Sequence, residues 1–380
     1  MEKDITTYIN KHTEKEIKAQ PRLWNETFSL LVETKKDIAL FLSPILQLKD
    51  LRIILTGAGS SAFVGEVAQG TIQQQTNLPT QLVATTDLVT HPEAFFIKQR
   101  PTLLISFARS GNSPESLEAA SLLDQHCDNA YHLIITCNPE GKLANFDTKN
   151  PLYSIQLPEE TNDKSLAMTS SFTAMLLTAL LVFDIDNIES KQQAVTNMIA
   201  IGEDLLKAED VFKEIAKSNF ERVVFLGSGP MVGIARECHL KLQELTDGQV
   251  ICKHDSFLGF RHGPRAVVNA NTLVVYLFSN DPHVFRYEKD LAEDIARDAR
   301  KIQSLTITDE PTLELENSKH IVTSAFKHSD NLNAVPTTLV GQLLGLHKSL
   351  TLGLDPDNPS VSGAINRVVQ GVTIYKREEK

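Results

Sequence analysis

The chain has 380 residues, of which 42% are apolar and 22% charged, so it is long enough for two globular domains of ordinary size. Its 37 basic and 48 acidic residues give a net charge of −11 without any block of Lys or Arg, which argues against broad nucleic-acid binding. Four scattered cysteines without a C-x-x-C pair favour neither a disulfide framework nor a zinc site. We therefore expect a cytoplasmic protein without a metal or another cofactor.

The elements predicted along the chain alternate between helices and short apolar strands. Residues 1–40 lack an apolar signal core and are expected to form a helical extension. The apolar run 172–183 is shorter than the roughly 20 residues that span a bilayer, so it predicts a buried helix and no membrane contact. The strand candidates are 52–57, 81–85, 102–107, 132–137 and 152–157, then 222–227, 249–253, 272–278, 304–308 and 320–324. Continuous apolar strands separated by helices predict an α/β fold of doubly wound parallel sheets.

The two halves of the sequence resemble each other. The segment RIILTGAGSSAFVGEVA from Arg52 matches RVVFLGSGPMVGIAREC from Arg222, an offset of 170 residues. A strand, a Gly-x-Gly turn and a helix recur in both. This duplication predicts a first domain over 41–190, a second over 205–354 and a helical connector between them, followed by a C-terminal tail over 355–380.

Two hydroxyl-rich loops of the first domain follow neighbouring strands. Ser60 and Ser61 follow the first strand in GAGSSAF, and Ser110 and Ser113 follow the third in ARSGNSPES. Helix N-termini with added hydroxyls and a glycine favour a phosphate. Simple helix capping, with Ser60 as N-cap, is the competing interpretation. A dinucleotide site is disfavoured, because the loop is not GxGxxG and no acidic residue ends the second strand.

The second domain serves as an internal comparison for these loops. Its first loop, GSGPMVG, has Ser228 and Pro230 in place of the paired serines, and the loop SNDPHVFRYEKD lacks glycine. We therefore expect the second domain to have lost the phosphate site and to carry another role.

That role is indicated by the segment over 235–268. Glu237, Lys241 and Glu244 recur at i, i+4 and i+7, so they lie on one face of a predicted helix. A solvated charged face is the usual fate of such a row, but apolar neighbours predict burial, and a buried carboxylate suits general base catalysis. His262 follows in an RHGP turn, where a structural or a catalytic role is open.

These motifs together resemble the sugar isomerase (SIS) domain family, and the resemblance covers nearly the whole chain from about residue 35. The halves are similar to the isomerase part of glucosamine-6-phosphate synthase, whose catalytic helix LEGALKLKE and KHGP turn correspond to ARECHLKLQE and RHGP. The resemblance implies Glu244 as the base that moves a proton between C1 and C2. It implies His262 as the ring-opening residue, contributed by a partner subunit, and Glu237 and Lys241 as supporting residues. The phosphate-binding residues that it implies are Ser60, Ser61, Arg109, Ser110 and Ser113.

One departure separates the chain from the synthase. The synthase ends in a segment like AKSVTVE, whose lysine contacts the substrate, whereas VQGVTIY here has Gln370 at that position, and no glutaminase domain is expected. The motifs NRVVQGV and TSSFT are more similar to the galactosamine-6-phosphate deaminase family, long labelled tagatose-6-phosphate ketose/aldose isomerase. This similarity adds Thr169, Ser170 and Gln370 to the implied substrate contacts.

The resemblance implies two tandem flavodoxin-like SIS domains that act on a sugar phosphate as a homodimer with shared sites. The implied reaction converts galactosamine 6-phosphate to tagatose 6-phosphate and ammonia. Plain ketose/aldose isomerisation and the corresponding reaction of glucosamine 6-phosphate are alternatives. A non-catalytic sugar-phosphate sensor is a third, disfavoured because such regulators usually pair one SIS domain with a basic helix-turn-helix domain.

Overall fold

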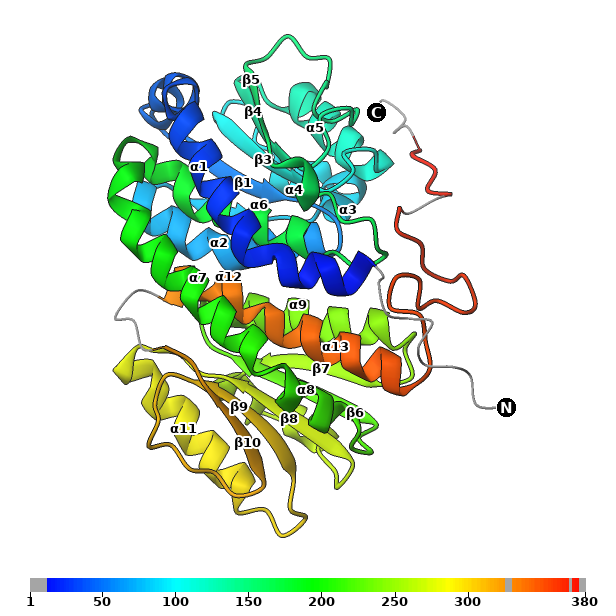
Figure 1. The fold of residues 1–380 in the computed structure, drawn as a ribbon. Coiled ribbons are helices and arrows are strands. Elements are labelled where there is room, and N and C mark those ends of the chain that lie inside the picture. Colours follow the sequence, from blue (N-terminus) through cyan, green and yellow to red (C-terminus); the bar gives the residue numbers. More distant parts are fainter. Residues whose placement is uncertain (1–11, 325–329, 369–370, 376–380) are drawn as a thin grey trace. The chain divides into compact units, whose positions relative to one another are not determined.

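A computed structural model describes residues 12–324, 330–368 and 371–375 (Figure 1). The chain forms two compact units, each built on one sheet. The first-sheet unit contains Glu26–Asn162, Ala174–Ser190 and the described residues from Ile365 onward. The second-sheet unit contains the described residues up to Asn25, Asp163–Thr173 and Lys191–Ala364. The division falls within three helical segments, so each unit combines several separate stretches of the chain.

The first sheet has five parallel strands in the order β2-β1-β3-β4-β5. Their bounds are β1 Arg52–Thr56, β2 Thr80–Leu82, β3 Thr102–Ala108, β4 Ala130–Thr136 and β5 Leu152–Gln156. Every residue of β1 and β3 is buried, as expected for a sheet covered on both faces. Because β1 and β3 are hydrogen-bonded neighbours, the loops that follow them leave the same edge of the sheet.

The second sheet repeats this topology, with the order β10-β9-β8-β6-β7 and parallel pairing throughout. Its strands are β6 Arg222–Gly227, β7 Ile251–Ser256, β8 Thr272–Leu277, β9 Gln303–Thr308 and β10 Ser318–Val322. On one face, Val224 and Val274 pack against Phe257 and Leu291, which belong to helices after β7 and β8. The strand β7 forms one edge of this sheet.

Helices make up most of the remaining chain. Those of the first half are α1 His12–Leu46, α2 Ser60–Thr76, α3 Thr85–Thr90, α4 Pro92–Phe95, α5 Pro114–His126, η2 Glu159–Thr161, α6 Ser170–Leu181 and η3 Val182–Lys191. Those of the second half are α7 Gln192–Lys207, α8 Glu209–Ala216, α9 Pro230–Leu245, α10 Phe257–Phe260, η4 Pro264–Val267, α11 Pro282–Ala296, α12 Asp330–Thr337 and α13 Leu339–Thr351.

The duplication seen in the sequence extends to the backbone. Gly59 and Gly229 have nearly the same backbone angles, with φ of 56° and 55°, in the left-handed region that favours glycine. A Cβ at Gly57 would lie 2.5 Å from the Ser61 carbonyl carbon, and one at Gly227 would lie 2.3 Å from the Met231 oxygen. Glycine is therefore required at both strand ends, because the next helix begins against the strand.

The strand predictions are confirmed, since each of the ten apolar runs overlaps a strand and both sheets are parallel. The second strand is shorter than expected, because α3 already begins at Thr85. The prediction of a buried helix is also confirmed by α6, whose residues are all buried. The segment Ser170–Lys207 has an apolar window of mean hydropathy 1.5, but 78% of it is buried inside the chain, as in a core helix of a globular protein.

Candidate active site

The loop after β1 places two serines in the first turn of α2. Ser60 and Ser61 are only 5% and 6% exposed. The N-cap of α2 is Gly59, and no side chain caps the helix. The competing interpretation, in which Ser60 is the N-cap, is therefore wrong, because the strand-to-helix turn needs a glycine at that position. The serine hydroxyls lie in the first turn of the helix, where backbone N–H groups and partial positive charge favour an anion.

The loop after β3 leads into α5 in a similar way. Ser113 is the N-cap of α5 in position only, since its side chain makes no bond to the helix N–H groups. Its hydroxyl lies 2.6 Å from the Ser116 hydroxyl, and the Ser110 hydroxyl accepts a weak bond of 3.3 Å from the Asn112 N–H. Ser110 and Ser113 are both partly exposed. Simple capping therefore does not explain the pair, and the helix start remains open to a ligand.

The neighbouring loop after β4, which was not predicted from the sequence, supports this turn. The Asn138 amide donates to the Ser110 carbonyl at 2.8 Å, and the Leu143 N–H donates to the Gly111 carbonyl at 2.9 Å. A Cβ at Gly141 would approach the Ser110 oxygen to 2.6 Å. Gly111 itself has a φ of 66°. The loop after β4 thus fixes the backbone on which the Ser110 hydroxyl is carried, and a rigid loop positions a ligand well.

Arg109 precedes the two serines and is buried, with 7% of its surface exposed. Its guanidinium donates to the Arg367 carbonyl in the C-terminal segment, and Arg367 in turn donates to the Asn162 side chain at 2.9 Å. An outward-facing Arg109 is therefore excluded. The side chain ties the C-terminal segment to the phosphate loop, so this part of the tail lies beside the candidate site.

The charged row of the second-sheet unit lies on α9. Lys241 contacts both acids, with its Nζ 3.4 Å from Glu237 Oε1 and 2.6 Å from Glu244 Oε2. Glu237 is 0% and Lys241 1% exposed, whereas the Glu244 side chain is 23% exposed. The interpretation of the row as a solvated face is therefore wrong. Glu244 alone in the row reaches the surface, and Lys241 holds its carboxylate in place.

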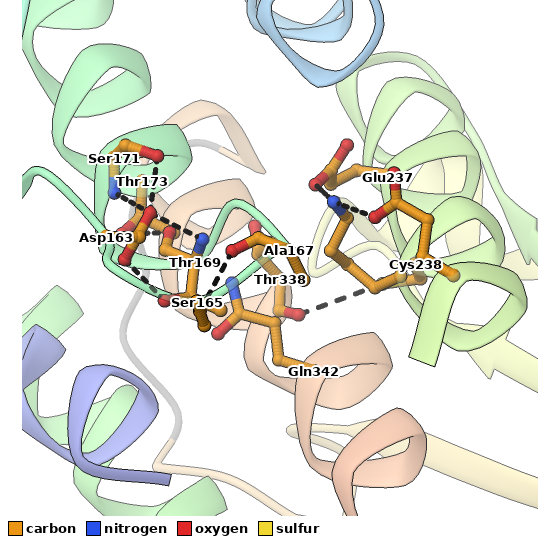
Figure 2. Close-up of polar contacts among 12 residues, drawn as sticks. Asp163, Ser165, Ala167, Thr169, Ser171, Thr173, Glu237, Cys238, Thr338 and Gln342 are labelled. Carbon is orange, nitrogen blue, oxygen red and sulfur yellow. Dashed lines mark hydrogen bonds and ion pairs between the residues drawn. The ribbon is translucent and has the colours of Figure 1, made fainter. Parts of the chain in front are cut away.

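The burial of the row follows from the packing of α9. The helix is covered by β6 and β7 on one side and by α13 on another. A Cβ at Gly341 of α13 would lie 2.4 Å from the Cys238 Cα, so the two helices approach closely. Figure 2 shows the Cys238 sulfur at this contact, 3.9 Å from the Thr338 carbonyl oxygen. Such tight packing fixes the helix that carries Glu244.

His262 lies apart from this row, in the turn between α10 and η4, and its side chain is exposed. Its N–H donates to the Gly259 carbonyl at 3.0 Å, and Gly263 after it has a φ of 119°. Among the described residues, no hydrogen bond or ion pair joins His262 to Glu244. The turn therefore presents the imidazole to solvent on a defined backbone.

Thr169 and Ser170, implied as substrate contacts, have structural partners and are 0% and 1% exposed. The Asp163 carboxylate accepts from the Thr169, Ser170 and Ser171 N–H groups at 2.8, 2.9 and 3.0 Å. It also accepts from the Thr169 hydroxyl at 2.6 Å (Figure 2). The Ser170 hydroxyl donates to the Glu16 carbonyl at 2.9 Å. An acidic cap of α6 explains these residues better than a substrate contact does.

The Asp163 cap carries a testable expectation for stability. Asp163→Ala would leave three buried N–H groups without their acceptor, so it is expected to lower the free energy of unfolding by about 2–3 kcal/mol. Denaturant unfolding measures the change. The matched control is Asp210→Ala, whose side chain is 95% exposed and should change stability by less than about 0.5 kcal/mol. Equal stability of the two variants would contradict the capping role.

The helix that follows β8 is capped by a side chain of the loop that precedes it. The Asp281 side chain caps α11 by accepting from the His283 N–H at 2.8 Å and the Val284 N–H at 3.3 Å. Asp281 thus occupies the place that the uncapped Ser113 has in the other unit. The start of α11 thus has a side-chain acceptor for its N–H groups that the start of α5 lacks. Gln370, the remaining predicted contact, lies outside the described residues.

Comparison with known proteins gives the family. The SIS domain model matches residues 45–184. The D-galactosamine-6-phosphate deaminase AgaS of Shewanella sp. (strain ANA-3) is 42% identical over 377 residues, which cover 98% of this chain and 93% of that protein. The chain belongs to the AgaS family of SIS-domain proteins.

Solved structures share this fold over nearly the whole chain. The structure of a proposed tagatose-6-phosphate ketose/aldose isomerase from Clostridium novyi NT is 37% identical with a TM-score of 0.94, covering 98% of this chain and 97% of that one. The tagatose-6-phosphate ketose/aldose isomerase from Escherichia coli is 35% identical with a TM-score of 0.88, covering 99% of both chains. The expected fold of two doubly wound sheets is confirmed.

Proposed function

We propose that this chain is an enzyme that converts galactosamine 6-phosphate and water to tagatose 6-phosphate and ammonia. A protein named as this deaminase is 42% identical to this chain over 377 residues, which supports galactosamine 6-phosphate as the substrate. The chemistry is supported by the charged row on α9, in which Lys241 holds the one carboxylate of the row that reaches the surface. A sugar-phosphate sensor would not require such a row.

The reaction needs one base that serves two carbons. Once the sugar ring is open, Glu244 removes the proton from C2, which leaves an enolamine with a double bond between C1 and C2. Protonation of C1 then gives a C2 imine, and water replaces the imine nitrogen with oxygen and releases ammonia. The configuration at C4 is untouched, so the galacto substrate gives the tagatose product. Proton transfer of this kind contributes about 10²–10⁴-fold to a rate.

The substrate phosphate is assigned to the two loops of the first sheet. Ser60 and Ser61 offer hydroxyls at the start of α2, and Ser110 and Ser113 at the start of α5. Both helix N-termini lack a side-chain cap, so their N–H groups and partial positive charge favour a dianion. Arg109 acts here by holding the Arg367 segment against the loop.

The ring-opening proton is assigned to His262, whose exposed turn is suited to reach a site on a second copy. The active form is therefore a homodimer with shared sites. We place the enzyme in the cytoplasm, where its sugar-phosphate substrate would be found.

Ketose/aldose isomerisation is the second candidate, because the Escherichia coli structure with this fold is named for it. The same base acting on a 2-hydroxy aldose phosphate would give a ketose without loss of ammonia. Galactosamine 6-phosphate, glucosamine 6-phosphate and tagatose 6-phosphate should each be incubated with the protein, and ammonia and ketose phosphate measured. Ammonia from galactosamine 6-phosphate is the expected result. Interconversion of tagatose 6-phosphate with an aldose, without ammonia from either amino sugar, would contradict the deaminase assignment.

The phosphate loop can be tested through substrate affinity. Changing Ser110→Ala and Ser113→Ala together removes two hydrogen bonds to a charged group, so KM is expected to rise about 10- to 100-fold with little change in kcat. Steady-state kinetics, with inorganic phosphate as a competitive inhibitor, measures this. Ser121→Ala, on the same helix but away from its N-terminus, is the control. A double variant with the KM and phosphate inhibition of the unmodified enzyme would show that the phosphate binds elsewhere.

A further inference from the structure

The outer edge of the second sheet is formed by β7. Only β6 pairs with β7 in the described part of the chain. The Ile251 N–H donates to the Glu221 carbonyl at 3.0 Å, on the β6 side. Because backbone groups alternate along a strand, the N–H and C=O groups of Cys252 and His254 point away from β6. An edge of this kind is a template for another strand, unless charges or coverage prevent it.

The side chains of β7 form a charge pattern that is complementary to itself. Lys253 and Asp255 lie on one face of the strand, one residue on each side of His254, and their charged atoms are 3.5 Å apart. Their side chains are 37% and 21% exposed. If two such strands run antiparallel about a twofold axis at His254, each Lys253 lies opposite an Asp255 of the other copy. Opposite charges at facing positions stabilise a strand pair, whereas like charges destabilise it.

We propose that β7 pairs with β7 of a second copy of this chain, antiparallel and centred on His254. In this register the outward groups of His254 pair with those of the second His254, and Cys252 pairs with Ser256. Lys253 and Asp255 then occupy the non-hydrogen-bonded positions, where facing side chains lie closest. A single contact of this type is isologous, so it closes as a dimer.

The ends of the strand support the same register. Ile251 at the start of β7 is 60% exposed, and Leu258, just after its end, is 51% exposed. Antiparallel pairing brings the start of one strand next to the end of the other. Each exposed Ile251 would thus be covered near Leu258 of the second copy, which removes two apolar side chains from water at each end of the interface.

The centre of the proposed interface is free of charge at neutral pH. His254 stacks on His239 of α9, with ring centroids 4.7 Å apart. Burial lowers the pKa of both His239 and His254 to about 4, and nearby Arg236 and Lys253 contribute to the lowering. Two copies of His254 can therefore meet at the axis near pH 7 without repulsion.

The interface also connects two parts of the proposed active site, and this step rests on the proposed function. Glu244 lies at the end of α9, shortly before β7, and His262 lies shortly after it. In an antiparallel pair, the segment after β7 of one copy lies beside the segment before β7 of the other. This pairing places His262 of one copy near the end of α9 in the second copy. Glu244 lies at that end of α9, so the two residues could form a shared site.

Charge reversal tests the register without any enzymatic assay. Lys253→Glu places a glutamate opposite Asp255 twice in each dimer, and Asp255→Lys places two lysines opposite each other. Sedimentation equilibrium is expected to show a dimer for the unmodified chain and a dimer dissociation constant about 10- to 100-fold weaker for each variant. An equimolar mixture of the two variants should regain dimers, because the glutamate introduced in one copy then faces the lysine introduced in the other. The double variant with both changes should dimerise like the unmodified chain.

Two controls separate the interface from general effects of charge and folding. Lys289→Glu makes the same change on α11, where the side chain is 44% exposed, and should leave association unchanged. Thermal unfolding of each variant checks that the fold persists. A monomeric unmodified chain, a dimer that neither reversal weakens, or a mixture that stays monomeric would each overturn the proposal. Because association is measured directly, the outcome is independent of whether the chain releases ammonia.

Discussion

Glu244→Gln is expected to lower kcat for release of ammonia from galactosamine 6-phosphate by about 10²–10⁴-fold. The amide keeps the size of the side chain but cannot take the proton from C2. KM should change little, because the phosphate loops lie on another part of the chain. Stability should also change little, because the Glu244 side chain is 23% exposed and Lys241 keeps its contact with Glu237.

Two further variants sharpen this expectation. Gln243→Ala alters the exposed neighbour of Glu244 on the same helix and should leave kcat unchanged. Glu244→Asp keeps the carboxylate but withdraws it by one methylene, so its activity should fall between that of the Gln variant and the unmodified enzyme. A Gln variant that retains full kcat would remove Glu244 from the role of base.

Lys241→Met is expected to lower the free energy of unfolding by about 3–5 kcal/mol, the largest stability change foreseen for this chain. Lys241 is 1% exposed and lies between two carboxylates, one of which, Glu237, is 0% exposed. Removal of the cation takes away the positive charge that offsets the buried Glu237 carboxylate. Chemical denaturation monitored by circular dichroism measures the change.

The double variant Lys241→Met with Glu237→Gln separates charge from packing. If the loss arises from an uncompensated buried charge, removal of that charge should restore part of the stability. If the loss arises from packing, the double variant should be no more stable than Lys241→Met. A Lys241→Met protein as stable as the unmodified chain would contradict the buried charged row itself.

The sequence is sufficient to predict both sheets and the common helical face of the charged row on α9. Fully buried parallel strands are continuous apolar runs, and this signal found every strand of both sheets. The repeated Gly-x-Gly turns reflect a close contact between strand and helix that only glycine permits, so the duplication was visible at Gly57 and Gly227. The spacing of Glu237, Lys241 and Glu244 placed the three on one helical face.

Contacts between distant segments were beyond this kind of prediction. Asp163 gives no local signal, because it caps a helix that begins seven residues later with Ser170. The direction of Arg109 depends on Arg367, which lies 258 residues away in the sequence. The choice between Gly59 and Ser60 as N-cap depends on backbone angles that the residue types alone do not fix. Each of these features depends on the conformation and packing of the folded backbone, so the neighbouring residues in the sequence do not indicate it.

The proposed reaction moves a proton from C2 to C1 of an amino sugar phosphate and releases its nitrogen. The most direct measurement is the reaction of galactosamine 6-phosphate in D₂O, with ammonia quantified and the sugar followed by NMR. We expect equal amounts of ammonia and tagatose 6-phosphate, with the product carrying a new C–H or C–D bond at C1. No ammonia, or ammonia released while C1 remains an aldehyde carbon, would contradict it.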